Sequence, residues 1–182
     1  LLEKMTSDRQ NAVVVTFFSF RYKKQPNAGT RLFIDVNGKV TGKNMSTKQT
    51  NVLKEEVRKV HSTGKSTWTE FDVDGEQMTV FLEFVPPAVS LVVVGAGNDV
   101  MPLVDMADVL GWDTTVIDGR ANYAKKERFA KVCDVLIAKP EQVINSVRID
   151  DFTFFALMTH NYNYDKALLF ELCQNNARYI AM

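Results

Sequence analysis

The chain has 182 residues, 46% of them apolar and 24% charged, a composition typical of a folded globular protein rather than a disordered one. Basic and acidic residues number 22 each, and this zero net charge argues against nucleic acid as a partner, because nucleic-acid-binding proteins carry a basic excess. No apolar run approaches the roughly 18 residues that a membrane span needs, so no membrane association is expected.

The first half predicts a small α+β domain, residues 1–87, built from antiparallel hairpins. Its expected strands cover 11–20, 30–36, 68–73 and 77–85. The first run is too continuously apolar for a solvent-facing strand and is expected to lie centrally in its sheet. Asn37-Gly38 predicts a type I′ turn. A capping-box pattern at Ser46 opens a helix that ends at Gly64, and His61 near its C-terminus is assigned a structural or surface role.

Pro86-Pro87 marks a domain boundary, because two prolines cannot continue a strand ladder. Residues 88–182 then alternate strands and helices, which predicts a parallel five-stranded, Rossmann-like sheet. The expected strands cover 89–94, 112–117, 132–138, 152–158 and 178–181. The expected helices cover 99–110, 124–131, 140–146 and 162–174.

A glycine turn organises this second domain. Gly95-Ala-Gly97 follows a buried strand and precedes a helix, and Asp118 lies 21 positions beyond Gly97. A Rossmann unit places a carboxylate at about this distance to accept ribose hydroxyls. The spacing favours a nucleotide-type ligand, whose phosphates a glycine turn and a helix N-terminus stabilise. The alternative is that the glycines serve only the packing of strand against helix.

Polar residues follow the first, second and fourth strands, at the edge where a doubly wound sheet binds its ligands. His160 and Gly97 are therefore expected to face each other across a crevice. The predicted cofactor-binding residues are Gly95, Gly97, Asn98, Asp99, Asp118, Arg120, His160 and Asn161. For the asparagines after the fourth strand, helix capping is the competing role.

No complete catalytic set accompanies this crevice. The sequence holds no Gly-x-Ser-x-Gly, no His-Glu-x-x-His, no Walker lysine and no paired cysteines, so no catalytic residue and no metal ligand is predicted. Cys133 and Cys173 are interpreted as reduced, packed thiols of a cytoplasmic protein. The pattern favours a binding protein over an enzyme.

Four segments of the second half carry a family resemblance: LVVVGAGND, VIDGR, ERF and LMTHNYNYDKALL. In this order they resemble the C-terminal Rossmann domain of the xanthine dehydrogenase accessory factor family, the XdhC/CoxI type. The likeness covers residues 91–182, and the opening hairpins are similar in layout. Residues 43–50 depart from the family, which usually has a Ser-Gly-Gly-Cys run there, and the later Gly-Cys-Gly-Gly segment is also absent.

The resemblance implies a protein that binds the molybdopterin cofactor and assists its sulfuration and insertion into a molybdenum hydroxylase. Implied partners are xanthine dehydrogenase and a cysteine desulfurase-type sulfurase, with a homodimer as a further option. Two other functions stay open. One is an NAD-dependent oxidoreductase, with Asp118 on the ribose and His160 moving a proton. The other is a nucleotide-sensing module that contacts a partner through the basic loop 21–24.

Overall fold

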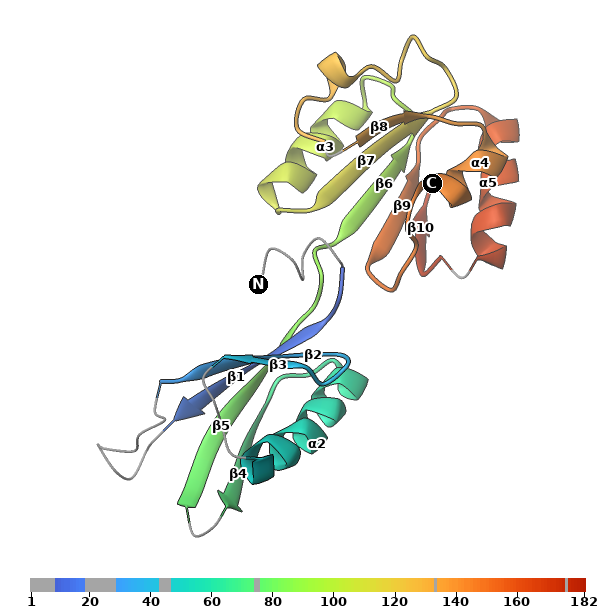
Figure 1. Ribbon diagram of the computed structural model, residues 1–182. Helices are drawn as coiled ribbons and strands as arrows, with labels where there is room; N and C mark the ends of the chain where they lie inside the picture. The colour runs from blue at the N-terminus through green and yellow to red at the C-terminus, as the bar shows by residue number, and fades with distance from the viewer. Residues whose placement is uncertain (1–8, 19–28, 43–46, 74–75, 133, 176) are drawn as a thin grey trace. The chain divides into compact units, whose positions relative to one another are not determined.

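The computed structural model describes residues 9–18, 29–42, 47–73, 76–132, 134–175 and 177–182. The chain folds as two compact units, Leu1–Pro87 and Ala88–Met182 (Figure 1). The capping residue Ser46, the loop 21–24 and Cys133 lie outside the described residues.

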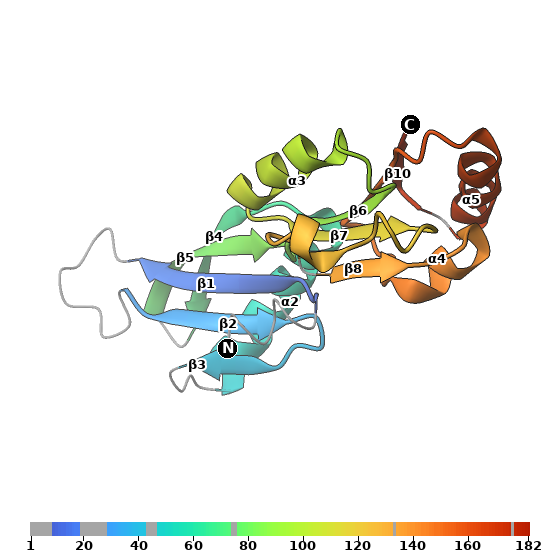
Figure 2. The same cartoon turned by 90° about the horizontal axis from the view of Figure 1, so that it is seen from above.

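The N-terminal unit contains an antiparallel sheet of five strands in the order β3-β2-β1-β5-β4. Its strands are β1 (Ala12–Phe18), β2 (Arg31–Asp35), β3 (Val40–Gly42), β4 (Thr67–Val73) and β5 (Glu76–Val85). Figure 2 shows β1, β2 and β3 side by side. The predicted central position of the first strand is confirmed, since β1 pairs with β2 on one side and β5 on the other.

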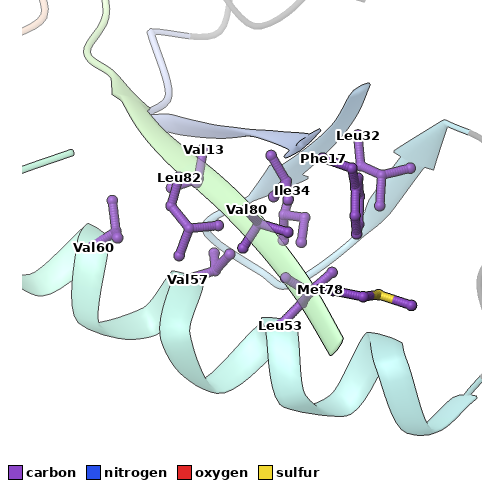
Figure 3. Close-up of a cluster of buried hydrophobic side chains, with 11 residues drawn as sticks. Val13, Phe17, Leu32, Ile34, Leu53, Val57, Val60, Met78, Val80 and Leu82 are labelled. Atoms are coloured by element: carbon purple, nitrogen blue, oxygen red, sulfur yellow. The ribbon is translucent and has the colours of Figure 1, made fainter. Parts of the chain in front are cut away.

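Helix α2 (Thr47–Thr63) covers one face of this sheet. Leu53, Val57 and Val60 recur at helical spacing and are each at most 2% exposed. Figure 3 shows these side chains pointing towards sheet residues such as Val13 and Leu82. Gly64 ends the helix with a φ of +62° and donates its N–H to Val60 O.

The turn between β2 and β3 differs from the prediction. A type I′ turn needs positive φ at both central residues, whereas Gly38 has a φ of +75° and Asn37 does not have a positive φ. Asp35 sets the geometry instead, because one of its carboxylate oxygens accepts the N–H groups of Asn37 and Lys39, each at 2.9 Å. The type I′ prediction is therefore wrong, although the hairpin is present.

The C-terminal unit is a parallel sheet in the order β10-β9-β6-β7-β8, the doubly wound arrangement that the sequence predicts. Its strands are β6 (Ser90–Val94), β7 (Asp113–Asp118), β8 (Asp134–Ile137), β9 (Thr153–Leu157) and β10 (Tyr179–Ala181). An α/β fold with a Rossmann-like sheet and a preceding α+β unit is thus confirmed.

Helices cover both faces of this parallel sheet (Figure 1). Leu91 and Val93 of β6 pack in one core with α3 (Val100–Val109), and the alternate residues Val92 and Val94 pack in the other with α4 (Pro140–Ser146) and α5 (Tyr162–Gln174). Burial on both sides explains why β6 is continuously apolar. Within the described residues, every helix is too short or not apolar enough to cross a bilayer.

Two details of this unit correct the sequence interpretation. The helix expected over 124–131 is only a 3-10 turn, η1 (Lys126–Arg128). The Arg128 side chain leaves this turn to bond other loops, and Phe129 is buried without a helical continuation. Cys173, expected to be packed, is exposed as a free thiol on α5.

Candidate functional site

Three loops begin at the same level on the carboxyl edge of the parallel sheet. Val94 is in register with Ile117 of β7 and Leu157 of β9. Main-chain bonds continue this alignment one residue further, with Gly95 N donating to Ile117 O at 2.7 Å and Met158 N donating to Val94 O at 2.6 Å. The predicted site residues on these loops are therefore brought to one edge.

Gly95 is required by packing between two of these loops. Its φ is +121°, and a Cβ at this position would collide with the main chain of Met158 and Thr159. The glycine lets the loop after β6 lie directly against the main chain that follows β9, so its packing role is between two loops and not between strand and helix as the sequence alternative proposed.

Gly97 occupies a more open position. A Cβ on Gly97 would meet only the side chain of Asp99. The main-chain N–H groups of Gly97 and Asn98 have no hydrogen-bond partner among the residues that the structure describes. They lie directly before α3, whose N-terminus carries a partial positive charge. Two free donors at this end can receive an anionic group.

Asp118 is 2% exposed, and its carboxylate is fully engaged. One oxygen accepts the main-chain N–H of Ala96 and an Arg120 side-chain N–H, each at 2.8 Å. The other oxygen accepts the main-chain N–H and Nε–H of Arg120, at 2.8 and 2.9 Å. Burial alone would raise the pKa of Asp118, but the bonds from Arg120 and Ala96 outweigh it and leave this pKa lowered.

These four bonds change the role expected for Asp118. A carboxylate has about four lone-pair sites, and protein donors fill all of them. The side chain therefore offers no acceptor to a ribose hydroxyl in this conformation. It instead joins the glycine turn to Arg120, whose guanidinium stacks 4.0 Å from the centre of the Tyr123 ring and is half exposed.

The sequence analysis did not predict Arg128 as a site residue. Its guanidinium donates to the carbonyls of Ala96 and Tyr123, each at 2.8 Å, and to Asn98 Oδ1 at 2.9 Å. Arg128 thus holds the carbonyl of Ala96, whose N–H Asp118 accepts, and both side chains fix the glycine turn. Its only sequence signal was the ERF segment within the family resemblance.

His160 bridges the loops after β9 and β6. Its Nε2 lies 2.9 Å from Asp99 Oδ2, so the predicted approach of His160 to the glycine turn is present. The residue has a φ of +55°, which is uncommon for a residue other than glycine, and its ring is exposed. The hydrogen bond from His160 is the main cause that lowers the pKa of Asp99.

Replacing His160 with glycine is expected to raise the pKa of Asp99 towards its ordinary value, because the variant keeps the positive φ and removes the imidazole. A lowered carboxyl pKa contributes stability that is present above the unfolded-state pKa and is lost as pH falls through the folded-state pKa. The stability difference between the two proteins should therefore narrow in acid. Carbon-13 NMR titration of the carboxylates measures this, and an unmoved Asp99 pKa contradicts the bridge.

Asn161 acts first as a helix cap. Its Oδ1 accepts the N–H groups of Asn163 and Tyr164 at 3.1 and 3.2 Å, so the capping role weighed from sequence is present. Asp165 accepts a 2.6 Å hydrogen bond from the Thr159 hydroxyl and stiffens the same loop. These two side chains fix the backbone that carries His160.

The described residues include no group of three histidine, cysteine, aspartate or glutamate side chains that could hold a metal ion. The edge instead combines free main-chain donors, a half-exposed guanidinium on Arg120 and an exposed imidazole on His160. Such groups bind and orient an anionic or polar ligand. The fold is that of a doubly wound α/β domain, and the candidate site lies at the carboxyl edge of its sheet, by the topological switch point.

Comparison with known proteins identifies the family of this chain. Residues 91–182 match the model of the XdhC Rossmann domain family, and the chain belongs to this family. The family resemblance carried by the sequence motifs is thereby confirmed.

Two individual proteins illustrate the relationship. The chain is 28% identical over 103 residues to a probable xanthine dehydrogenase subunit of Bacillus subtilis (strain 168), a match covering 57% of this chain and 31% of that protein. It thus spans about a third of the length of this curated relative. The crystal structure of a xanthine dehydrogenase from Bacillus halodurans matches 98% of this chain and 79% of its own, with a TM-score of 0.50 and 18% identity, which shows the shared fold.

Proposed function

We propose that this protein is an accessory factor of xanthine dehydrogenase that binds the molybdopterin cofactor without transforming it. The family and the name of the Bacillus subtilis relative support the association with xanthine dehydrogenase. A cysteine desulfurase-type sulfurase would supply the sulfur ligand, and the client enzyme would receive the loaded cofactor. The cofactor, when bound, supplies the molybdenum centre that the client uses.

The observation that carries this proposal is the set of free donors at the glycine turn. The N–H groups of Gly97 and Asn98 would hold the cofactor phosphate, with Arg120 adding a positive charge. His160 Nε2 bonds Asp99 Oδ2 next to this turn, which occupies one oxygen of that carboxylate. The residues present therefore fit a phosphorylated ligand, and the site needs no nucleophile to carry it.

The oxidoreductase alternative is weaker for a physical reason. An NAD-binding Rossmann domain uses the carboxylate after its second strand to accept ribose hydroxyls. In this protein the oxygens of Asp118 are already engaged by Ala96 and Arg120. A bound NAD would have to break one of these bonds.

Anaerobic thermal shift with molybdopterin cofactor or NAD tests the proposal. We expect the cofactor to stabilise the protein, by about 2.7 kcal/mol at 100 times its dissociation constant. Gly97→Ala should reduce this stabilisation, because a methyl group would stand beside the two free N–H groups. Gly111→Ala, at the opposite end of α3 with no atom near its Cβ position, is the matched control and should retain it. Stabilisation by NAD alone would favour the oxidoreductase, and a response to neither ligand would refute the proposal.

A further inference from the structure

A second cluster of charged side chains lies in the N-terminal unit. Lys54, Arg58 and His61 follow one another at i, i+4 and i+7 along α2, so they share one side of the helix. This side faces the β2–β3 turn, where Asp35 and Gly38 lie, and together they line a pocket of about 180 Å³. The pocket is smaller than the roughly 300–1,000 Å³ of sites for drug-sized ligands, so it suits a small ion.

The imidazole of His61 lies in this pocket with both ring nitrogens buried and without a hydrogen-bond partner among the described residues. The ring packs edge-on against Phe84, with centroids 6.3 Å apart. Burial lowers the pKa of His61, although the nearby carbonyls of Ile34 and Asp35 oppose this effect. At least one ring nitrogen always carries a hydrogen, so the ring can donate to an acceptor in the pocket.

The two cations beside His61 are not neutralised. Neither Lys54 nor Arg58 forms an ion pair with any residue that the structure describes. The Lys54 side chain reaches the turn, with its Cε 3.9 Å from the Cβ position of Gly38. By contrast, Lys59 of the same helix pairs with Glu56 at 2.7 Å. Two cations without an ion pair in the described part of the chain and a histidine therefore line one small pocket, which favours an anion.

The carboxylate of Asp35 limits which anions can bind in this pocket. Its Oδ1 accepts the N–H groups of Asn37 and Lys39, and its Oδ2 has no hydrogen-bond donor in the described part of the chain. A free carboxylate oxygen repels a fully ionised anion such as sulfate. It can, however, accept the hydrogen of a P–OH group, and inorganic phosphate keeps such a hydrogen at neutral pH.

We propose that Lys54, Arg58, His61 and Asp35 form a binding site for inorganic phosphate. The cations neutralise its charge, the His61 ring donates to one oxygen, and Asp35 accepts the P–OH hydrogen. A phosphate monoester loses this hydrogen with a pKa near 6 and is mostly a dianion at pH 7.5, so the site discriminates against it. The site lies within the N-terminal unit and does not depend on the function proposed for the C-terminal unit.

Isothermal titration calorimetry of the full chain tests the site at pH 7.5 and constant ionic strength, with inorganic phosphate, sulfate or methyl phosphate. We expect phosphate to bind more tightly than either competitor. Lys54→Gln and Arg58→Gln should each weaken phosphate binding by about tenfold or more. Lys59→Gln, on the same helix outside the pocket, is the matched control and should bind as the parent does. Equal binding of phosphate and sulfate by the parent protein would overturn the proposal.

Proton NMR of the histidine rings gives a second readout. The sequence contains two histidines, and a His160→Gly variant assigns their signals. Phosphate should move the His61 signal. Asp35→Asn should admit sulfate, because an amide no longer repels it. An unmoved His61 signal, or unchanged phosphate affinity in both cation variants, would refute the site.

Discussion

Asp118→Ala is expected to lower the free energy of unfolding of the C-terminal unit by about 2–4 kcal/mol. The variant leaves the N–H of Ala96 without its acceptor, and it removes the carboxylate that pairs with the Arg120 guanidinium. Hydrogen bonds to a charged group contribute about 1.5–3 kcal/mol each, and because Arg120 is half exposed its share is at the lower end. Urea unfolding at pH 7 measures this loss.

Asp134→Ala is the matched control for this prediction. Asp134 is an exposed carboxylate at the start of β8 in the same sheet, so its removal should change the free energy of unfolding by no more than about 0.5 kcal/mol. Similar losses in the two variants would show that the buried network at Asp118 does not stabilise the unit.

The pH dependence of the Asp118 variant follows from the sign of its pKa shift. The folded-state pKa of Asp118 is lowered, so its contribution is fully present above the unfolded-state pKa of about 3.9. That contribution is lost as pH falls through the folded-state value. The stability difference between parent and Asp118→Ala should therefore shrink below about pH 4, and a difference that stays constant in acid would contradict the shift.

The predicted part of the fold rests on local patterns. Continuous apolar runs gave β1 and β6, and an apolar stripe at helical spacing gave α2, because these periods depend on which faces are buried. The helix expected over 124–131 was wrong. It rested on the alternation of strands and helices in residues 88–182, but Phe129 is buried beside η1 and Arg128 bonds the carbonyl of Ala96, 32 residues away. Neither contact has a local signal.

The sequence predicted where the site residues lie, but it predicted only part of what each side chain does. Strand ends and a doubly wound order place Gly97, Asp118 and His160 at one edge, as parallel register requires. The partners of each side chain depend on loop conformation. The structure shows Asp118 bonded to Arg120, two residues away. The sequence spacing is the same for a carboxylate bonded in this way and for one with free oxygens that can bind a ligand.

Gly95→Ala is expected to destabilise the C-terminal unit by about 2–6 kcal/mol. The φ of +121° is open essentially only to glycine, which costs another residue about 1–3 kcal/mol. Contact of the new methyl group with the main chain of Met158 adds about 1–3 kcal/mol, because backbone at the end of a central strand cannot move aside. Thermal and urea unfolding measure the total.

Two further glycines separate these causes. Gly111→Ala also meets a positive φ, +70°, but has open space around its Cβ position, so it should cost only about 1–2 kcal/mol. Gly97→Ala has no such φ, and its methyl group meets only the exposed Asp99 side chain, so it should cost the least. The order Gly95, Gly111, Gly97 therefore tests whether the first glycine of the turn serves packing while the last remains available to a ligand. A Gly95→Ala protein as stable as Gly97→Ala would show that the loop does not press against β9.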